Sequence, residues 1–226
     1  MKARRPARRP AAVIFDMDGL MLDTESLGPQ TWRDAAAAVG VDFDPALLPA
    51  MIGRNSRDTR VLLRERYGPD YPVERLTAAY LVAFDAIVAR EGIAQKAGLR
   101  ELLDWLEREN VLRAVATSTR RDRAEAQLAQ QGLLGRFALL VGGNDVAQGK
   151  PAPDIFLLAA ARLDVAAADC VVLEDSEPGV RAALAAGMMP IMVPDLHGPS
   201  DRLLAHEPLV LASLHDVRAH LAVLPR

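Results

Sequence analysis

The sequence predicts an α/β protein: a doubly wound parallel sheet, Rossmann-like, with a small α-helical unit inserted after the first strand. Short apolar runs alternate with amphipathic stretches along most of the chain, which is typical of strands buried on both faces of a parallel sheet. The alternation is interrupted once, between Ser26 and Gln95, where every periodic segment is helical. The 226 residues, of which 50% are hydrophobic, suffice for one large domain or two small ones.

The predicted strands are brief, mostly apolar segments bounded by turn or charged residues: Ala11–Asp16, Leu112–Thr117, Ala138–Val141, Cys170–Glu174 and Pro190–Val193. Helical spacing between them predicts helices at Leu99–Glu109, Asp122–Gln131, Pro153–Leu163 and Pro178–Ala186. Gly132 and Gly187 follow two of these helices, at the position where a helix end favours glycine. Alternating strands and helices predict a doubly wound core.

The insert contains three predicted helices: Thr31–Val39, which stops at Gly40, Arg57–Tyr67, which follows Ser56, and Val73–Arg90. We therefore predict a core of residues 11–25 and 96–226 and a helical cap of residues 26–95 over the site. Residues 1–10 are basic, and we expect a flexible, solvated N-terminus, with an interaction tail as the alternative.

Composition excludes several classes of protein. A net charge of −3 argues against a general nucleic-acid binder, although a small phosphorylated substrate needs only local positive charge. No run is long and apolar enough for a membrane span, and no apolar segment follows the basic start as in a secretory signal. The single cysteine, Cys170, excludes an internal disulfide, so we expect a cytoplasmic protein, and we expect a monomer.

Four polar features follow predicted strands. Because the carboxyl ends of parallel strands meet at one edge of the sheet, where ligands of such folds bind, we expect these side chains to converge. They are Asp16 with Asp18, Thr117-Ser118-Thr119, Gly149-Lys150-Pro151, and Glu174-Asp175.

This combination predicts phosphoryl transfer. A carboxylate can attack phosphorus and form an aspartyl-phosphate. Carboxylates as close as Asp16 and Asp18 repel one another, so a hard cation is required, and Mg²⁺ prefers oxygen ligands. Lys150 would offset charge on the transferring group, while a hydroxyl would hold a phosphate oxygen. An EF-hand is excluded because Gly19 comes too early, and a P-loop because Pro151 replaces the required Ser or Thr.

The run from Phe15 to Glu25, Phe-Asp-Met-Asp-Gly-Leu-Met-Leu-Asp-Thr-Glu, resembles the first motif of haloacid dehalogenase superfamily phosphatases. The other three motifs are matched by Thr117, by Lys150 within Gly149–Phe156, and by Glu174-Asp175-Ser176. The resemblance extends from Ala11 to about Asp195, and implies the Rossmann-like core of that superfamily.

The resemblance also implies roles for the acidic residues. Asp16 would be the nucleophile, and Asp18 the general acid for the leaving alcohol and then the base for water. Asp16, the backbone carbonyl of Asp18 and Asp175 would hold Mg²⁺. Glu174 would support the metal, directly or through water. The presence of Asp18 argues against the dehalogenases themselves, which lack that second acid.

Thr117 and Lys150 would bind the phosphoryl group, with help from the amide of Ser118. The helical insert resembles the cap of the subgroup that contains β-phosphoglucomutase, sugar-phosphate phosphatases and pseudouridine-5′-phosphatase. Mutases carry a histidine early in the first cap helix, where this chain has Gly28, and this difference favours water as the acceptor.

The segment from Gly53 to Arg57 resembles the substrate loop of the same subgroup. Arg57 is the residue we expect to meet the distal part of the substrate, followed by Arg54 and Asn55. The sequence thus predicts a Mg²⁺-dependent phosphatase that hydrolyses a small sugar or nucleoside phosphate through an aspartyl-phosphate. The alternatives are a phosphosugar mutase and a catalytically silent module that binds a phosphorylated metabolite.

Overall fold

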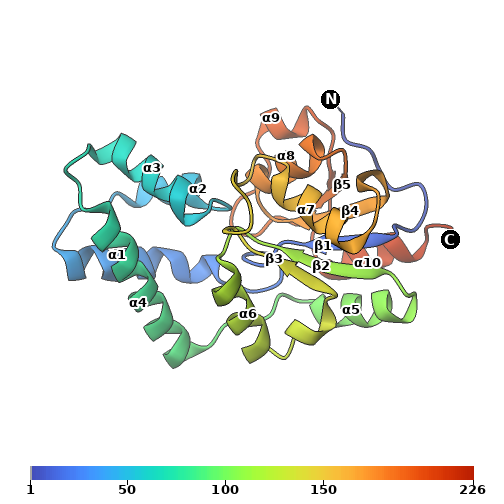
Figure 1. Ribbon diagram of the computed structural model, residues 1–226, viewed down its shortest axis with the longest axis horizontal. Helices are drawn as coiled ribbons and strands as arrows, with labels where there is room; N and C mark the ends of the chain where they lie inside the picture. Colours follow the sequence, from blue (N-terminus) through green and yellow to red (C-terminus); the bar gives the residue numbers. More distant parts are fainter. Residues whose placement is uncertain (1) are drawn as a thin grey trace.

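The computed structural model describes residues 2–226. Its sheet has six parallel strands in the order β3-β2-β1-β4-β5-β6 (Figure 1). The strands are β1 (Ala12–Phe15), β2 (Leu112–Ala116), β3 (Leu139–Val141), β4 (Cys170–Glu174), β5 (Met189–Met192) and β6 (Leu209–Val210). The predicted α/β class is confirmed, and β1–β5 match the predicted strands, whereas β6 was not predicted.

The central position of β1 brings together segments that are far apart in sequence. Ile14 pairs with Ala114 on β2 and with Val172 on β4. Because all three strands run in the same direction, the residues that follow them emerge side by side. The sheet order therefore explains why the polar features at the strand ends meet.

Helices cover both faces of the sheet (Figure 1). The core helices are α5 (Leu99–Arg108), α6 (Arg121–Gln130), α7 (Asp154–Leu163), α8 (Glu177–Ala185), α9 (Asp201–Leu204) and α10 (Leu214–Ala222). Successive residues of β1 point to opposite faces: Val13 and Phe15 belong to the hydrophobic cluster with α5 and α10, while Ile14 belongs to the cluster with α7 and α8. Both faces of β1 are thus buried, as a parallel sheet requires.

A second group of helices lies beside the core, at the left of Figure 1. It consists of α1 (Gly28–Val39), α2 (Leu48–Met51), α3 (Ser56–Tyr67) and α4 (Val73–Glu91), and we call it the helical insert. These helices share a hydrophobic cluster of their own, which includes Trp32, Leu63 and Leu76. Trp32 stacks on Phe43 with ring centroids 5.1 Å apart, and lies 4.3 Å from the Tyr80 ring.

Two neighbouring segments connect the insert to the core. The Asp23 amide donates to the Ala94 carbonyl at 2.9 Å, and the Lys96 amide donates to the Met21 carbonyl at 2.9 Å. The Lys96 ammonium also bonds Asp23 at 3.0 Å and Asp195 at 2.5 Å. The entry and exit of the insert are therefore held against each other.

The basic N-terminal segment differs from the expected solvated tail, although Met1 lies outside the described residues. The Ala3 amide donates to the His206 carbonyl at 2.7 Å. Arg9 bonds the Leu224 carbonyl at 3.2 Å, and its guanidinium lies over the Trp105 ring, 5.5 Å from the centroid. The segment thus packs on the core at Arg9, while Lys2, Arg4, Arg5 and Arg8 remain exposed to solvent. Within residues 2–226, no helix combines the length and apolar character needed to cross a membrane.

Candidate active site

Asp16 and Asp18 follow β1, where the chain turns sharply at Gly19. Asp16 is only 6% exposed. Gly19 has φ +82°, and a Cβ on it would lie 2.3 Å from a carboxylate oxygen of Asp175. The turn therefore needs glycine for two reasons, its left-handed backbone and its close approach to the loop after β4. This contact places the acidic residues of the two strand ends together.

Lys150 enters the same cluster from the loop before α7, and its side chain is almost fully buried. Its ammonium bonds Asp16, the Glu174 Oε1 at 2.6 Å and the Ala116 carbonyl at 3.1 Å. Burial by itself lowers the pKa of Lys150, but the neighbouring charges of Asp16 and Glu174 outweigh it and hold the pKa above its usual value. Lys150 is therefore a permanent cation within a group of acids.

The acids outnumber this one cation. Asp16, Glu174 and Asp175 each place a carboxylate oxygen within 4.8 Å of the others. Burial raises the pKa of Asp175 well above its usual value, and the charges of Glu174 and Asp16 raise it further. Burial likewise raises the pKa of Asp16, against the lowering effect of Lys150. Such a set of crowded oxygen ligands fits a divalent cation, which would offset the excess negative charge.

The carboxylate oxygens of this acidic cluster are not equally available to a cation. Glu174 uses Oε1 for Lys150, and its Oε2 accepts the Ser176 amide at 3.0 Å and the Ser176 hydroxyl at 2.8 Å. Asp16 bonds Lys150 through Oδ1 alone among the hydrogen bonds described for residues 2–226. The second oxygen of Asp16 is thus the one placed to react or to coordinate.

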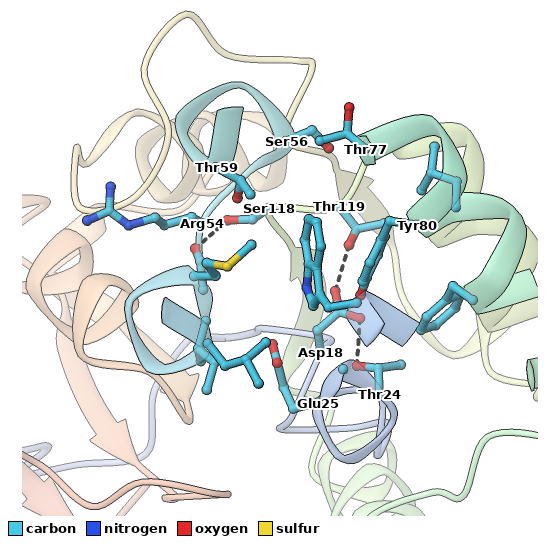
Figure 2. A pocket seen from close by; sticks show the side chains of 18 of the residues that line it. Asp18, Thr24, Glu25, Arg54, Ser56, Thr59, Thr77, Tyr80, Ser118 and Thr119 are labelled. Carbon is cyan, nitrogen blue, oxygen red and sulfur yellow. Dashed lines mark hydrogen bonds between the residues drawn. The ribbon is translucent and has the colours of Figure 1, made fainter. Parts of the chain in front are cut away.

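Asp18 is held differently, by hydroxyl groups. Its Oδ1 accepts the Thr24 hydroxyl at 2.8 Å. Its Oδ2 accepts the hydroxyls of Thr119 at 2.7 Å and Thr117 at 3.1 Å. Figure 2 shows Asp18 at the floor of the pocket, with dashed lines to Thr24 and Thr119. The two aspartates of the first motif therefore have different environments, one next to an ammonium and one among hydroxyls.

The remaining predicted phosphate-binding residues lie beside this pair. Thr117 is fully buried, and its hydroxyl oxygen accepts the Thr119 amide at 3.0 Å. The Ser118 hydroxyl donates to the Gly53 carbonyl at 2.8 Å, which links the loop after β2 to the helical insert. The structure thus gathers all of the predicted core residues: Asp16, Asp18, Thr117, Ser118, Lys150, Glu174 and Asp175.

A cavity of about 690 Å³ lies between the insert and the core, and Asp16 and Asp18 line it. α3 contributes Ser56, Thr59 and Arg60, which share one face of the helix, to its lining. Aromatic residues of the insert line it as well: Trp32, Tyr80 and Phe84. In Figure 2 the ring of Tyr80 reaches down from α4 toward Asp18.

The predicted substrate residues of the insert are only partly brought to this cavity. Arg54 lines it, with its Nε bonded to the Ala50 carbonyl at 2.7 Å, and Figure 2 shows its guanidinium directed away from Asp18. Arg57 pairs with Asp58 at 3.3 Å, leaves 62% of its side chain exposed, and is not among the cavity-lining residues. Ser56 and Arg60 lie on the face of α3 that is turned to the cavity, and the position of Arg57 along the helix turns its side chain away from that face.

Asn55 also has a structural position instead of a cavity-lining one. Its Oδ1 accepts the Asp58 amide at 2.9 Å and so caps the N-terminus of α3. Its amide nitrogen packs on Gly149, where a Cβ would come within 2.0 Å. Asn55 therefore joins the insert to the loop that carries Lys150, and the structure does not bring it to the cavity.

Sequence reasoning assigned no role to four residues at the site: Thr24, Glu25, Thr119 and Tyr80. Thr24 and Glu25 belong to the first motif, and Thr119 belongs to the Thr117-Ser118-Thr119 feature, so their place in the sequence indicates that they lie near the site. Burial raises the pKa of Glu25 to about 7, and the charges of Asp18 and Asp195 contribute. Tyr80 had no sequence signal, because only the packing of α4 brings it to the cavity.

Comparison with known proteins shows the family of this chain. A family model for haloacid dehalogenase-like hydrolases matches residues 10–187. The chain is 33% identical to a probable pseudouridine-5′-phosphatase of Drosophila melanogaster, over 99% of this chain and 98% of that protein. It is 31% identical to a bifunctional riboflavin kinase/FMN phosphatase of Arabidopsis thaliana over 92% of this chain, and spans 54% of that longer protein.

A solved structure supports the same assignment at the level of the fold. The crystal structure of a hydrolase from Pseudomonas syringae superposes with a TM-score of 0.81 at 26% identity, over 95% of this chain and 99% of that one. The match includes the helical insert as well as the sheet, since it covers nearly the whole chain. The chain belongs to the haloacid dehalogenase-like hydrolases.

Proposed function

We propose that the protein is a Mg²⁺-dependent phosphatase that hydrolyses a small sugar or nucleoside phosphate through an aspartyl-phosphate on Asp16. One observation carries the proposal: Asp16 and Asp18 lie on the floor of one cavity in two different environments. Asp16 contacts the Lys150 ammonium, and the side-chain donors described for Asp18 within residues 2–226 are all hydroxyl groups. Two carboxyl groups in unlike surroundings suit two different chemical roles.

The proposed reaction has two steps. The free oxygen of Asp16 attacks phosphorus, the bond from phosphorus to the substrate oxygen breaks, and Asp18 gives its proton to the leaving alcohol. Asp18 then accepts a proton from water, which attacks the phosphoryl group on Asp16 and releases inorganic phosphate. Lys150, the Thr117 hydroxyl and the Ser118 amide hold the phosphoryl oxygens and stabilise their charge.

Asp16, Asp175 and the backbone carbonyl of Asp18 would hold the Mg²⁺ ion, with Glu174 acting through water because both its oxygens already accept hydrogen bonds. The bound ion would offset the negative charge that the carboxylates and the phosphate bring together. The oxygen-only donor set supports magnesium over a softer metal.

We further propose that residues 26–95 form a cap that covers the substrate. Contacts across the cavity support this: Ser118 bonds Gly53 at 2.8 Å, and Arg123 of α6 pairs with Asp85 of α4 at 2.6 Å. A closed cap would exclude bulk water while the phosphoryl group is transferred. Arg54 and Arg60, which line the cavity, are the candidates for contact with the distal part of the substrate.

Water is the proposed acceptor, in preference to a second hydroxyl of a sugar. Gly28, at the position where mutases carry a histidine, lines the cavity, and a Cβ there would meet nothing within 4 Å. The space is thus present, but no side chain at that position can shuttle a proton for a sugar acceptor. We propose a monomer that works in the cytoplasm on a free phosphorylated metabolite, without nucleic acid or membrane as a partner.

The test is a screen for phosphate release from ribose 5-phosphate, glucose 6-phosphate, fructose 1-phosphate, uridine 5′-monophosphate and 4-nitrophenyl phosphate. We expect turnover with Mg²⁺, none after chelation, and recovery on adding Mg²⁺ back.

The Asp16→Asn protein should fold and release no phosphate. A sugar 1-phosphate given with a trace of bisphosphate distinguishes a mutase, since isomerisation without free phosphate contradicts the proposal. No turnover of any phosphomonoester, with ligand binding retained, indicates a binding module.

A further inference from the structure

The site contains more hydroxyl groups around Asp18 than phosphate binding requires. Thr24, Thr117 and Thr119 come from two different loops, and all three donate to the Asp18 carboxylate at 2.7 to 3.1 Å. Thr24 reaches one oxygen, while Thr117 and Thr119 share the other. The shortest of the three bonds is that of Thr119, at 2.7 Å. The family motifs assign a phosphate contact to Thr117 but leave Thr119 without a role.

Thr117 cannot serve Asp18 and the phosphate together. A threonine hydroxyl has a single proton to donate. In the structure that proton points to Asp18, and the Thr117 oxygen already accepts the Thr119 amide. When a phosphoryl group takes the Thr117 proton, as the proposed function requires, Oδ2 of Asp18 keeps Thr119 as its only described donor.

The position of Thr119 is fixed independently of its side chain. Its amide donates to Thr117 at 3.0 Å, and its carbonyl accepts the Gly143 amide at 2.8 Å. Gly143 is itself packed on the same loop, since a Cβ there would lie 2.1 Å from the Ser118 carbonyl oxygen. The backbone is therefore held from both sides, and the hydroxyl is directed to Asp18 before any substrate binds.

We propose that Thr119 is a positioning residue, which holds the Asp18 carboxyl group in line with the leaving oxygen after Thr117 has turned to the phosphate. The inference rests on the proposed function, because it assumes that Asp18 transfers protons in both steps. A carboxyl group that is held at only one of its two oxygens, here by Thr24, delivers its proton less often in the correct direction. The loss should therefore appear in turnover and leave substrate binding unchanged.

The test compares the Thr119→Val and Thr119→Ser proteins with wild type. Valine keeps the shape of the side chain and removes the hydroxyl, whereas serine keeps the hydroxyl. On the alkyl phosphate from the screen with the highest kcat/KM, we expect kcat of Thr119→Val to fall about 10- to 100-fold with KM unchanged. Thr119→Ser should regain most of kcat.

Substrates with different leaving groups distinguish a loss of proton transfer by Asp18 from a general loss of activity. 4-Nitrophenol leaves readily without a proton, so formation of the phosphoenzyme from 4-nitrophenyl phosphate, seen as a burst, should slow by less than about threefold. The following hydrolysis step should slow as much as kcat on the alkyl phosphate. Thr31→Val serves as the matched control, because it removes a buried hydroxyl that donates to the Leu27 carbonyl at 2.7 Å, away from the cavity lining, and should leave kcat unchanged.

Three results would overturn the inference alone: unchanged kcat in Thr119→Val, a raised KM with normal kcat, or equal slowing of the burst and the hydrolysis step. A wild-type protein with no phosphatase activity would overturn the proposed function and this inference together. Melting temperatures of all variants, measured in parallel, identify any loss that comes from unfolding.

Discussion

At the scale of single residues, the buried charges around Lys150 make stability depend on this one side chain. Its ammonium lies between two buried carboxylates, Asp16 and Glu174. In the Lys150→Ala protein those carboxylates would be buried without a cation, so we expect the free energy of unfolding to fall by about 3 to 5 kcal/mol. Urea denaturation in metal-free buffer measures this.

Lys96→Ala is the matched control for that loss. Lys96 also bonds two carboxylates, Asp23 and Asp195, but a quarter of its side chain is exposed. Solvent screens the unpaired charges there, and the expected loss is about 1 kcal/mol. Similar losses of unfolding free energy in Lys150→Ala and Lys96→Ala would show that burial of the ion pair does not determine its contribution.

Glu25 gives the site a predicted pH dependence. Its pKa is about 7 in the folded protein, compared with a usual value of 4.5, mainly because of burial. The folded state therefore binds this proton more tightly than the unfolded state, and its contribution to stability is lost as pH rises through about 7.

In the Glu25→Gln protein this dependence should disappear. With chelator present, we expect the variant to exceed wild type in unfolding free energy at pH 8 by on the order of 2 kcal/mol, after allowing for partial exposure, and to match it below pH 4.5. Denaturant titrations across this range provide the measurement. Parallel curves for the two proteins would show that Glu25 does not carry the shifted proton.

The core site residues could be predicted because their chemistry is local in sequence. Asp16 and Asp175 directly follow β1 and β4, Lys150 lies in the loop before α7, and the sheet order brings these positions together. Tyr80 and Arg60 could not be predicted in the same way. Their contact with the cavity depends on the rotation of α3 and α4 about their own axes, which the packing of the insert sets.

At the scale of elements, one glycine controls how closely the insert approaches the core. Gly53 has φ +73°, and a Cβ on it would lie 2.6 Å from the Ser176 hydroxyl, in the loop after β4. Gly40, which ends α1, has a similar φ of +75° but no atom within 4 Å of a Cβ. Alanine at either position therefore strains the backbone, but only alanine at position 53 would also clash with Ser176.

We expect Gly40→Ala to lower stability by about 1 kcal/mol, from the strain of a left-handed alanine, without changing kcat/KM. Gly53→Ala adds the clash with Ser176 and should lower kcat/KM at least about tenfold, equivalent to about 1.4 kcal/mol. Steady-state kinetics and thermal melts of both proteins check this. A Gly53→Ala enzyme as active as Gly40→Ala would show that the close approach is not needed for turnover.

Element boundaries show where the sequence was informative. β4 is Cys170–Glu174 as predicted, because its apolar run is continuous and bounded by charge. β6 has only two residues, Leu209–Val210, too few for a period to be visible. The sequence does not predict α10, because its apolar positions are too sparse to show a helical period, although Ser213 caps it. The shift in α3 arises because Asn55 caps the helix and Ser56 is its first residue.

At the scale of the whole molecule, the sheet and the helical insert contribute different parts of the site. The parallel sheet fixes the phosphate-handling residues at its carboxyl edge, where burial keeps them in place. The helical insert supplies the opposite wall of the cavity. The sequence predicts a division of this kind, because the helical stretch between Ser26 and Gln95 interrupts the alternation of strands and helices. It could not predict the distal contacts, which depend on how the two parts meet.

The central claim is that Asp16 carries the phosphoryl group, and acid-quenched mass spectrometry tests it most directly. Enzyme mixed with 4-nitrophenyl phosphate and Mg²⁺ is stopped within one turnover and digested. We predict one added phosphoryl group on the peptide that contains Asp16, absent in Asp16→Asn. A phosphoryl group on another residue, or full turnover by Asp16→Asn, would contradict the account.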